Sequence, residues 1–226
     1  AVGVDMDEYS PLEGYTVLDL TQSIAGPTAT QFLGTLGADV IKVEPPSGDA
    51  FRGLLDGAMF AAVNIGNKRS VAVDLKSEDG KEAVSRIAAD ADVVLESFRP
   101  GTVEKFDLDY DTVSEANPDV VYLSLSGYGQ DGPRSDWPAY DPAIQAVSGL
   151  MSTIGYPDRP PVRIGASVVD MGTGTLAAFL VVSALLGRSK DGGGEYFDVS
   201  LFETAVMWMG YWIAHYTGAG GGPPQS

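Results

Sequence analysis

The chain has 226 residues, 44% of them hydrophobic and 20% charged, which is the composition of a soluble globular protein with an ample core. Thirty-one acidic residues face 14 basic ones, and the formal net charge is -17. No basic stripe is present, so neither nucleic acid nor an anionic membrane is an expected partner.

The acids are spread over every segment, and such a surface suits a protein that stays soluble in high salt. A halophilic source is therefore expected, with an unusually acidic mesophilic protein as the alternative. The chain has no cysteine and one histidine, His215, which excludes disulfides, thiolate or histidine metal clusters and a cysteine nucleophile. The lack of such clusters leads us to expect a protein without a metal. Because no signal peptide or membrane span is recognisable, we expect a cytoplasmic protein.

The first part of the chain alternates predicted strands and helices. β-rich runs predict strands over 15–20, 39–43, 70–75, 92–96 and 120–126. Helices are expected to begin at Pro27, Ser77 and Asp111, and the first has an apolar face formed by Ala29, Phe32, Leu33 and Leu36. This alternation predicts an α/β fold in one large domain over 1–226, a doubly wound, mostly parallel Rossmann-like sheet flanked by helices.

The second part is dominated by two apolar segments. After a Gly/Pro/aromatic loop over 127–142 and a helix to about Met151, the apolar run 176–186 predicts a helix buried in the core. Its 11 residues are too few to span a bilayer. A strand over 196–201 and a single apolar helix over 203–216 follow, and the helix carries three aromatic residues expected in the core or an interface, Trp208, Tyr211 and Trp212.

A ligand site is expected where the first strand ends. The loop over 21–26 lies at the carboxyl end of that strand, which is where open α/β sheets bind ligands, although it lacks a GxGxxG fingerprint. Phe98 offers a stacking face for a base nearby. The basic side chains that could hold a polyphosphate at this edge are Lys68, Arg69, Lys76, Arg99 and Lys105. The alternative is that these bases are solvated charges that balance the abundant acids.

Asp170 is the candidate nucleophile. It stands at the expected start of the core helix, where free N–H groups and the helix dipole should keep its carboxylate ionised. Gly172 and Gly174 beside it lack side chains, which should give a ligand access. The alternative is a helix-capping role, because Ser167 and Asp170 also form a capping-box pattern. A carboxylate needs no general base, and acyl exchange on a thioester through a mixed anhydride suits it.

Six motifs in chain order resemble the family III CoA-transferases, a family that also includes formyl-CoA and carnitine CoA-transferases and α-methylacyl-CoA racemases. They are VLDLT at 17–21 with AGP at 25–27, GADVIKVE at 37–44, NKRS at 67–70, ESFRPG at 96–101, SGYGQ at 126–130 and DVSLF at 198–202. The family's proteins are about twice as long and form interlocked homodimers. The resemblance therefore implies the N-terminal, CoA-binding half of a longer chain, without the small second domain.

The resemblance also implies the site residues. Asp170 matches the family's nucleophilic aspartate, and backbone amides near Gly172 are expected to stabilise developing oxyanions. Coenzyme A, as the acyl-CoA substrate, is expected to contact Ile24, Ala25, Val73, Leu75, Lys76, Ser97, Phe98, Arg99 and Lys105. Near the thioester the resemblance places Ala139, Tyr140 and Asp141. The exchange conserves one thioester, so neither ATP nor a metal is required.

Departures from the family pattern narrow the function. A glutamine common in the formyl enzymes is Ile24 here and an arginine is Pro45, which disfavours formyl-CoA and oxalate. Racemases resembling this chain have a histidine at the position of Tyr140, and tyrosine is a poor acid/base at neutral pH. We expect CoA transfer from an acyl-CoA to a small carboxylic acid. With a halophilic source, the resemblance to the family's members in halophilic archaea implies succinyl-CoA and mesaconate or another dicarboxylate. An acyl-CoA racemase and a non-catalytic CoA-binding module are the alternatives.

Overall fold

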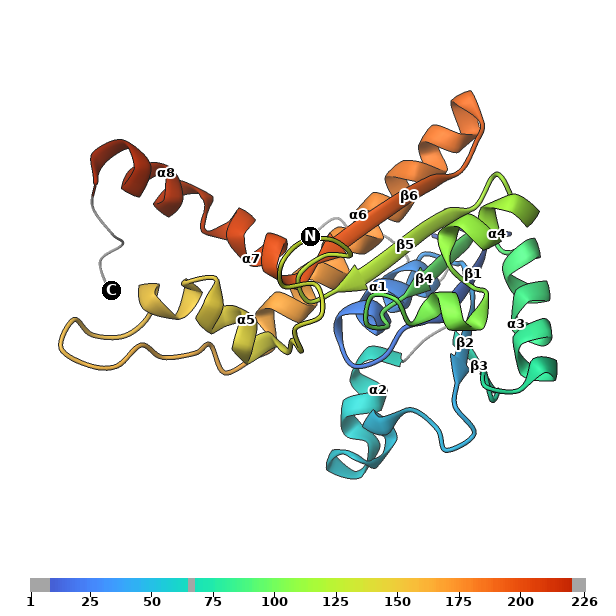
Figure 1. Cartoon of the computed structure of the whole chain (residues 1–226), viewed down its shortest axis with the longest axis horizontal. Coiled ribbons are helices and arrows are strands. Elements are labelled where there is room, and N and C mark those ends of the chain that lie inside the picture. Colours follow the sequence, from blue (N-terminus) through green and yellow to red (C-terminus); the bar gives the residue numbers. More distant parts are fainter. Residues whose placement is uncertain (1–8, 65–67, 221–226) are drawn as a thin grey trace.

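A parallel six-stranded sheet forms the centre of the protein (Figure 1). The structure is a computed structural model that describes residues 9–64 and 68–220. Within them the strand order is β3-β2-β1-β4-β5-β6, and all five pairings are parallel. The strands are β1 Thr16–Leu20, β2 Asp39–Glu44, β3 Lys68–Ala72, β4 Val93–Glu96, β5 Val121–Ser126 and β6 Glu195–Ser200. The predicted doubly wound α/β fold is confirmed.

Helices cover both faces of the sheet and divide the core in two. On one face α1 (Ala25–Thr35) and α6 (Val168–Asp191) pack against side chains such as Val17 and Leu95. On the other, residues of α3 (Glu78–Asp90) and α4 (Tyr110–Ala116) pack with Leu18 and Val94. Neighbouring strand residues thus point to opposite cores, which explains the continuous apolar strands. The other helices are α2 Ala58–Asn64, α5 Asp141–Val147, α7 Leu201–Trp208 and α8 Gly210–Ala219, with short 3-10 segments at Ala50–Gly53, Leu55–Gly57, Val103–Phe106 and Leu150–Thr153.

Several element boundaries differ from the sequence expectations. The strand expected over 70–75 begins at Lys68, and the helix expected from Pro27 begins two residues earlier, where Pro27 still needs no N–H in the first turn. Phe32 is 40% exposed, so it does not share the buried face of Ala29. The predicted helix over 203–216 is two helices, because the backbone turns at Met209. Asn67 of the NKRS motif lies outside the described residues.

Helix α6 is the longest helix in the described part of the chain, with 24 residues. The apolar run over 176–186 is the central part of this helix, and Val168–Lys190 as a whole is long and apolar enough, by length and composition alone, to cross a membrane. In the structure this helix lies along one sheet face, where Ala177, Val181 and Leu185 are buried in the core. A core helix of a globular protein passes the same test of length and composition, and α6 has the contacts of one.

The glycines at the start of α6 allow close packing. A Cβ added at Gly174 would lie 2.4 Å from the carbonyl oxygen of Ala25, and one added at Gly172 would lie 2.0 Å from the indole of Trp208. The sequence suggested that Gly172 and Gly174 give a ligand access to Asp170, whereas in the structure they allow this close packing. They let the first turn of α1 and the side chain of Trp208 contact the backbone of α6.

Replacing Gly174 with alanine should destabilise the protein. The new methyl group meets backbone atoms of α1 that cannot turn away, so we expect the free energy of unfolding to fall by about 2 kcal/mol. Gly187→Ala is the matched control on the same helix, since nothing lies within 4 Å of a Cβ there, and it should stabilise by about 0.5 kcal/mol. Urea unfolding at constant salt measures both changes, and equal effects would contradict the close α1–α6 contact.

Candidate active site

Buried charged side chains hold the loop that follows β1 in place. Asp19 is fully buried and accepts hydrogen bonds from the amide of Thr21 at 2.9 Å and the hydroxyl of Thr30 at 2.6 Å. Lys42, also buried, donates to the carbonyl oxygen of Thr21 at 2.7 Å and pairs with Asp49 at 3.5 Å. Charged groups stay buried only when they are paired in this way. The network fixes the start of the loop over 21–24.

Two of the expected phosphate-binding bases have structural roles instead. The side chain of Lys68 is 3% exposed, pairs with Asp19 at 3.4 Å and donates to the carbonyl oxygen of Pro27 at 2.8 Å. Burial lowers the pKa of Lys68 to about 8. Arg69 forms an ion pair with Asp39, the first residue of β2 and thus at the opposite edge of the sheet. Neither base is available at the carboxyl edge.

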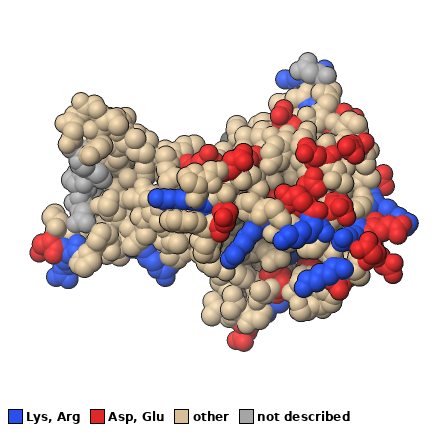
Figure 2. Space-filling view, in the orientation of Figure 1, with Lys and Arg blue, Asp and Glu red and all other residues tan. Residues whose placement is uncertain are grey.

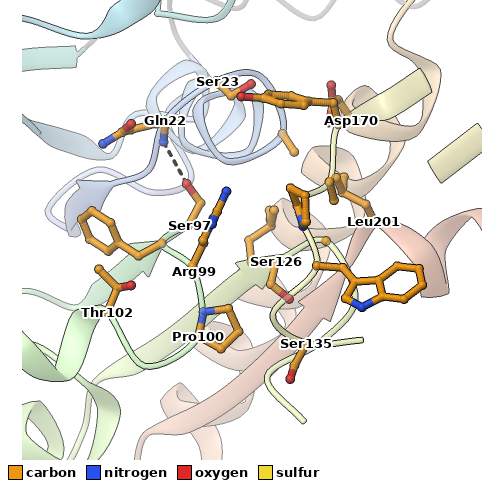
Figure 3. Close-up of a pocket in the computed structure, with 18 residues that line it drawn as sticks. Gln22, Ser23, Ser97, Arg99, Pro100, Thr102, Ser126, Ser135, Asp170 and Leu201 are labelled. Atoms are coloured by element: carbon orange, nitrogen blue, oxygen red, sulfur yellow. Dashed lines mark hydrogen bonds between the residues drawn. The ribbon is translucent and has the colours of Figure 1, made fainter. Parts of the chain in front are cut away.

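A cleft of about 460 Å³ opens at the carboxyl ends of β1, β4 and β5 (Figure 3). The amide of Gln22 donates to the hydroxyl of Ser97 at 2.9 Å, which joins the loops that follow β1 and β4. In Figure 3 the Arg99 side chain extends into the space beside Ser97, and Asp170 lies on the helix side of the cleft. This is the sheet edge at which the sequence places a ligand site.

Asp170 borders the cleft but is only 7% exposed. Burial, and then the negative charge of Asp141, raise the pKa of Asp170 to about 7. The expectation of a carboxylate kept ionised by the helix start is wrong, because the nearest amides serve another acid. Asp141 accepts hydrogen bonds from the amide of Val169 at 2.7 Å and from that of Asp170 at 3.2 Å. The capping box is also absent, since Ser167 makes no side-chain cap hydrogen bond.

The first turn of α6 offers no free amide to an oxyanion. The amide of Met171 donates to the carbonyl oxygen of Ser167 at 3.0 Å, and the two preceding amides are bound by Asp141. Gly172 lies within the helix, one residue further on. The expectation that amides near Gly172 stabilise an oxyanion is therefore wrong for this structure.

Most of the residues expected to contact CoA line two adjoining hollows. The Asp170 cleft is lined by Ala25, Ser97, Phe98, Arg99, Ala139 and Tyr140. A second cavity of about 230 Å³ shares Gln22 and Phe98 with the cleft and is also lined by Val73, Leu75, Lys76 and Phe106.

Three expected residues lie outside the lining of both hollows. Ile24 is the N-cap residue of α1 and is half-buried. Lys105 is exposed in the 3-10 segment after β4. Asp141 is 2% exposed and is bound to the backbone of α6.

Sequence reasoning missed several residues that line the cleft. They are Gln22, Ser23, Ser126, Ser135, Trp137 and Leu201. Ser126 is the first residue of the SGYGQ motif, and Gln22 and Ser23 belong to the loop expected to bind a ligand. Their position in that motif or loop could have identified them as cleft residues. Ser135 and Trp137 lie in an irregular loop whose path over the cleft no local pattern predicts.

This fold and site define an α/β protein with a cleft at the carboxyl edge of a parallel sheet, beside a buried carboxylate. The family model described as CoA-transferase family III matches residues 12–226, and the chain belongs to this family. The resemblance seen in the sequence motifs is thus confirmed.

Relatives named for different CoA-transfer substrates are similar to this chain. The formyl-CoA:oxalate CoA-transferase of Streptomyces avermitilis is 42% identical over 84% of this chain and 47% of its own length. For the succinyl-CoA:glutarate CoA-transferase of Homo sapiens the values are 38%, 94% and 50%, and for the succinyl-CoA:mesaconate CoA-transferase of Haloarcula hispanica 38%, 95% and 57%. The chain spans about half the length of the curated relatives it matches, as expected for an N-terminal half.

A solved structure shares the fold closely. The crystal structure of a CAIB/BAIF family protein from Brucella suis superposes with a TM-score of 0.92 at 37% identity, over 96% of this chain and 60% of that one. The parallel sheet with its covering helices is therefore an arrangement also found in an experimental structure.

Substituting Asp170 with asparagine should stabilise the protein, most of all at alkaline pH. Below about pH 3 the carboxyl is protonated in both the folded and the unfolded chain. Between that pH and about 7 the carboxyl ionises in the unfolded chain while it stays mostly protonated in the folded protein, so the free energy of unfolding falls as the pH rises. Above about pH 7 the carboxyl is ionised in both states, and the free energy of unfolding lost in this way is not regained. Asp170→Asn should raise the free energy of unfolding by up to about 4 kcal/mol near pH 8, and by less near pH 5.5.

The control for that measurement is an exposed acid. Asp158→Asn removes a charge from an exposed turn and should change the free energy of unfolding little at either pH. Denaturant unfolding over the pH range distinguishes the two variants. An Asp170→Asn effect that is small, or the same at both pH values, would contradict the raised pKa.

Proposed function

We propose that the full-length protein transfers CoA from an acyl-CoA to a small carboxylic acid, with Asp170 as the nucleophile. The observation that carries this proposal is a buried carboxylate that borders a cleft at the carboxyl edge of the sheet. Burial raises the pKa of Asp170 to about 7, so at pH 7 about half of the Asp170 carboxyl groups are still ionised and able to attack, and each is more basic than an ordinary aspartate. Membership of CoA-transferase family III supports the reaction class.

The proposed reaction needs no redox partner and conserves one thioester. Asp170 attacks the thioester carbonyl, a C–O bond forms, the C–S bond breaks, and the CoA thiolate leaves a mixed anhydride. The thiolate then attacks the aspartyl carbonyl, which releases the donor carboxylate and leaves an aspartyl-CoA thioester. The acceptor carboxylate attacks the aspartyl carbonyl of that thioester, a C–O bond forms, the C–S bond breaks, and the CoA thiolate leaves a second mixed anhydride. The thiolate then attacks the acceptor carbonyl of this anhydride and releases the Asp170 carboxylate. The new acyl-CoA departs and Asp170 is regenerated.

Unpaired cations near the cleft support binding of the CoA phosphates. Seven of the 14 basic residues form ion pairs with acids in the described part of the chain. Arg99 in the cleft and Lys76 in the adjoining cavity are not among them. Figure 2 shows Lys and Arg side chains in an interrupted band across the body of the protein. In a chain with 31 acids, such cations are the natural contacts for a polyphosphate.

The second cavity suits the adenine base. Phe98 and Phe106 meet edge to face there, with ring centroids 5.7 Å apart, and Val73 and Leu75 complete an apolar wall. A planar base finds stacking and apolar contacts in such a hollow. Gln22 and Phe98 line both hollows, so one extended molecule can occupy the two together, with its thioester end toward Asp170.

For the substrates we propose succinyl-CoA as donor and mesaconate or another dicarboxylate as acceptor. Relatives named for succinyl-CoA act with glutarate or mesaconate, and the chain is 37–39% identical to them. A relative named for formyl-CoA and oxalate is 42% identical, so overall identity alone does not decide between these substrates. Arg99 in the cleft supplies a positive charge that a second carboxylate of the substrate can contact.

We also propose an interlocked homodimer in a halophilic cytoplasm. Helix α8 and the segment after α5 project from the sheet as two arms (Figure 1), and no described residue of α8 is buried. Exposed aromatic residues on them, Tyr156, Tyr211 and Tyr216, are 60–69% exposed, a pattern typical of surfaces covered by further protein. The net charge of -17 supports the high-salt setting.

Loss of the Asp170 carboxylate should abolish CoA exchange. In the full-length protein, Asp170→Ala should lower kcat by at least about 10³-fold while acyl-CoA still binds. Hydroxylamine or borohydride trapping during turnover, followed by peptide mass analysis, should give an adduct on the Asp170 peptide. Full exchange activity in Asp170→Ala would exclude the mechanism. If the parent protein exchanges α-protons with deuterium and does not exchange CoA, it is a racemase. If it binds acyl-CoA without either reaction, it is a CoA-binding module.

Arg99→Ala should weaken recognition of CoA or of the acyl carboxylate. We expect KM for acyl-CoA to rise about 10-fold, because a charge-assisted hydrogen bond contributes more than a neutral one. Lys190→Ala is the control, as this exposed cation lies in the last turn of α6, far along the helix from Asp170. Comparing acyl-CoA with acyl-pantetheine then locates the contact, and an unchanged KM for both would contradict a role of Arg99.

A further inference from the structure

Asp141 is buried, and both oxygens of its carboxylate are hydrogen-bonded within the protein. It is the first residue of α5 and only 2% exposed. One carboxylate oxygen accepts hydrogen bonds from the amides of Val169 and Asp170, at 2.7 and 3.2 Å, and the other accepts from the side-chain amide of Gln145 at 2.5 Å. Gln145 in turn accepts from the amide of Ile164 at 2.9 Å. Three segments of the chain therefore meet at this carboxylate.

We propose that Asp141 is a positioning residue that holds the backbone of Asp170 and withholds the amides at the start of α6 from the Asp170 carboxylate. The inference rests on the proposed role of Asp170 as nucleophile. It differs from a contact with CoA, because the Asp141 side chain is directed at the backbone of α6 and does not line the cleft.

This arrangement has a chemical consequence. Free amides at a helix start usually stabilise a nearby carboxylate and make it less basic. Here Asp141 occupies those amides and adds a second negative charge beside Asp170. Together with burial, this charge raises the pKa of Asp170. Because attack on a carbonyl becomes faster as the nucleophile becomes more basic, Asp141 keeps Asp170 reactive while it remains partly ionised near neutral pH.

Few other charged or titratable groups of the described chain face Asp170. Helix α1 has none, and the acid of α7, Glu203, accepts a hydrogen bond from Ser200 at 2.9 Å. Tyr122 of β5 points to the opposite core, and by register so do Tyr196 and Asp198 of β6.

The remaining groups lie further along α6 or across the cleft. Glu195 lies with the C-terminal half of α6, beside Leu180 and Arg188, and Lys190 is in the last turn. The cleft adds Arg99 and Tyr140. Of all these, Asp141 is the acid bound to the Asp170 amide itself.

The pH dependence of CoA exchange tests the proposal. In the full-length protein, Asp141→Asn keeps an oxygen that can accept from both amides but removes the charge. We expect the acidic limb of kcat/KM to move to lower pH by about one pH unit, and the limiting rate at high pH to fall several-fold. A purely structural role would lower Tm and leave the midpoint unchanged, and that result would overturn the proposal.

A double variant guards against misfolding of the single one. In Asp141→Asn with Gln145→Glu, the asparagine amide can donate to the new carboxylate, which still accepts from the amide of Ile164. The hydrogen bonds are then restored while the charge lies one side chain further from Asp170. An acidic limb displaced to lower pH in a variant with a native Tm supports the proposal. Asp158→Asn, which removes one exposed charge, should leave the midpoint unchanged, and an equal displacement there would overturn it.

A second readout does not depend on activity. The Asp170 carboxyl carbon, labelled with ¹³C in aspartate and assigned by its loss in Asp170→Asn, should titrate at lower pH in Asp141→Asn than in the parent protein. An unchanged titration would overturn the proposal even if the enzyme is active. If the parent protein exchanges no CoA, the proposed function fails, whereas the titration still shows whether Asp141 acts on Asp170.

Discussion

The close contact between α1 and α6 is the constraint on which the site depends. The backbone of α1 at Ala25 approaches α6 at Gly174 so closely that no side chain fits between them. Ala25 begins α1 directly after the loop that follows β1, and Asp170 lies one turn before Gly174, so this contact brings the loop and Asp170 to opposite sides of one cleft. A wider crossing would separate them, because both are carried on rigid helices.

Buried charge provides the second constraint. In a chain with so few bases, Lys42 and Lys68 are enclosed in the protein with Asp19 and Asp49. Such networks are costly to assemble but very unfavourable to break, because an unpaired charge would remain in the interior. They therefore fix one arrangement of the loop over 21–24, and the bases left at the sheet edge are free to meet a ligand.

Asp170 shows how the environment decides the chemistry of a side chain. The same residue at an open helix start would be an ordinary, fully ionised cap. Burial under the cleft, and a neighbouring carboxylate that takes the amides, raise its pKa to about 7. The Asp170 carboxyl and the neighbouring negative charge of Asp141 come from different segments, α6 and the start of α5, about 30 residues apart in the chain.

The sequence by itself determined the order of strands and helices and the parallel sheet, because periodicity and turn residues are local signals. Motif spacing and the end of the first strand also led to the proposed ligand edge and to Asp170 as the candidate nucleophile. Tertiary structure alone decided that Lys68 and Arg69 are engaged elsewhere, that Gly172 and Gly174 serve packing, and that Trp137 lines the cleft. It also decided the protonation of Asp170. Desolvation and the charge of a distant residue depend on which segments meet in space, and no local pattern contains that information.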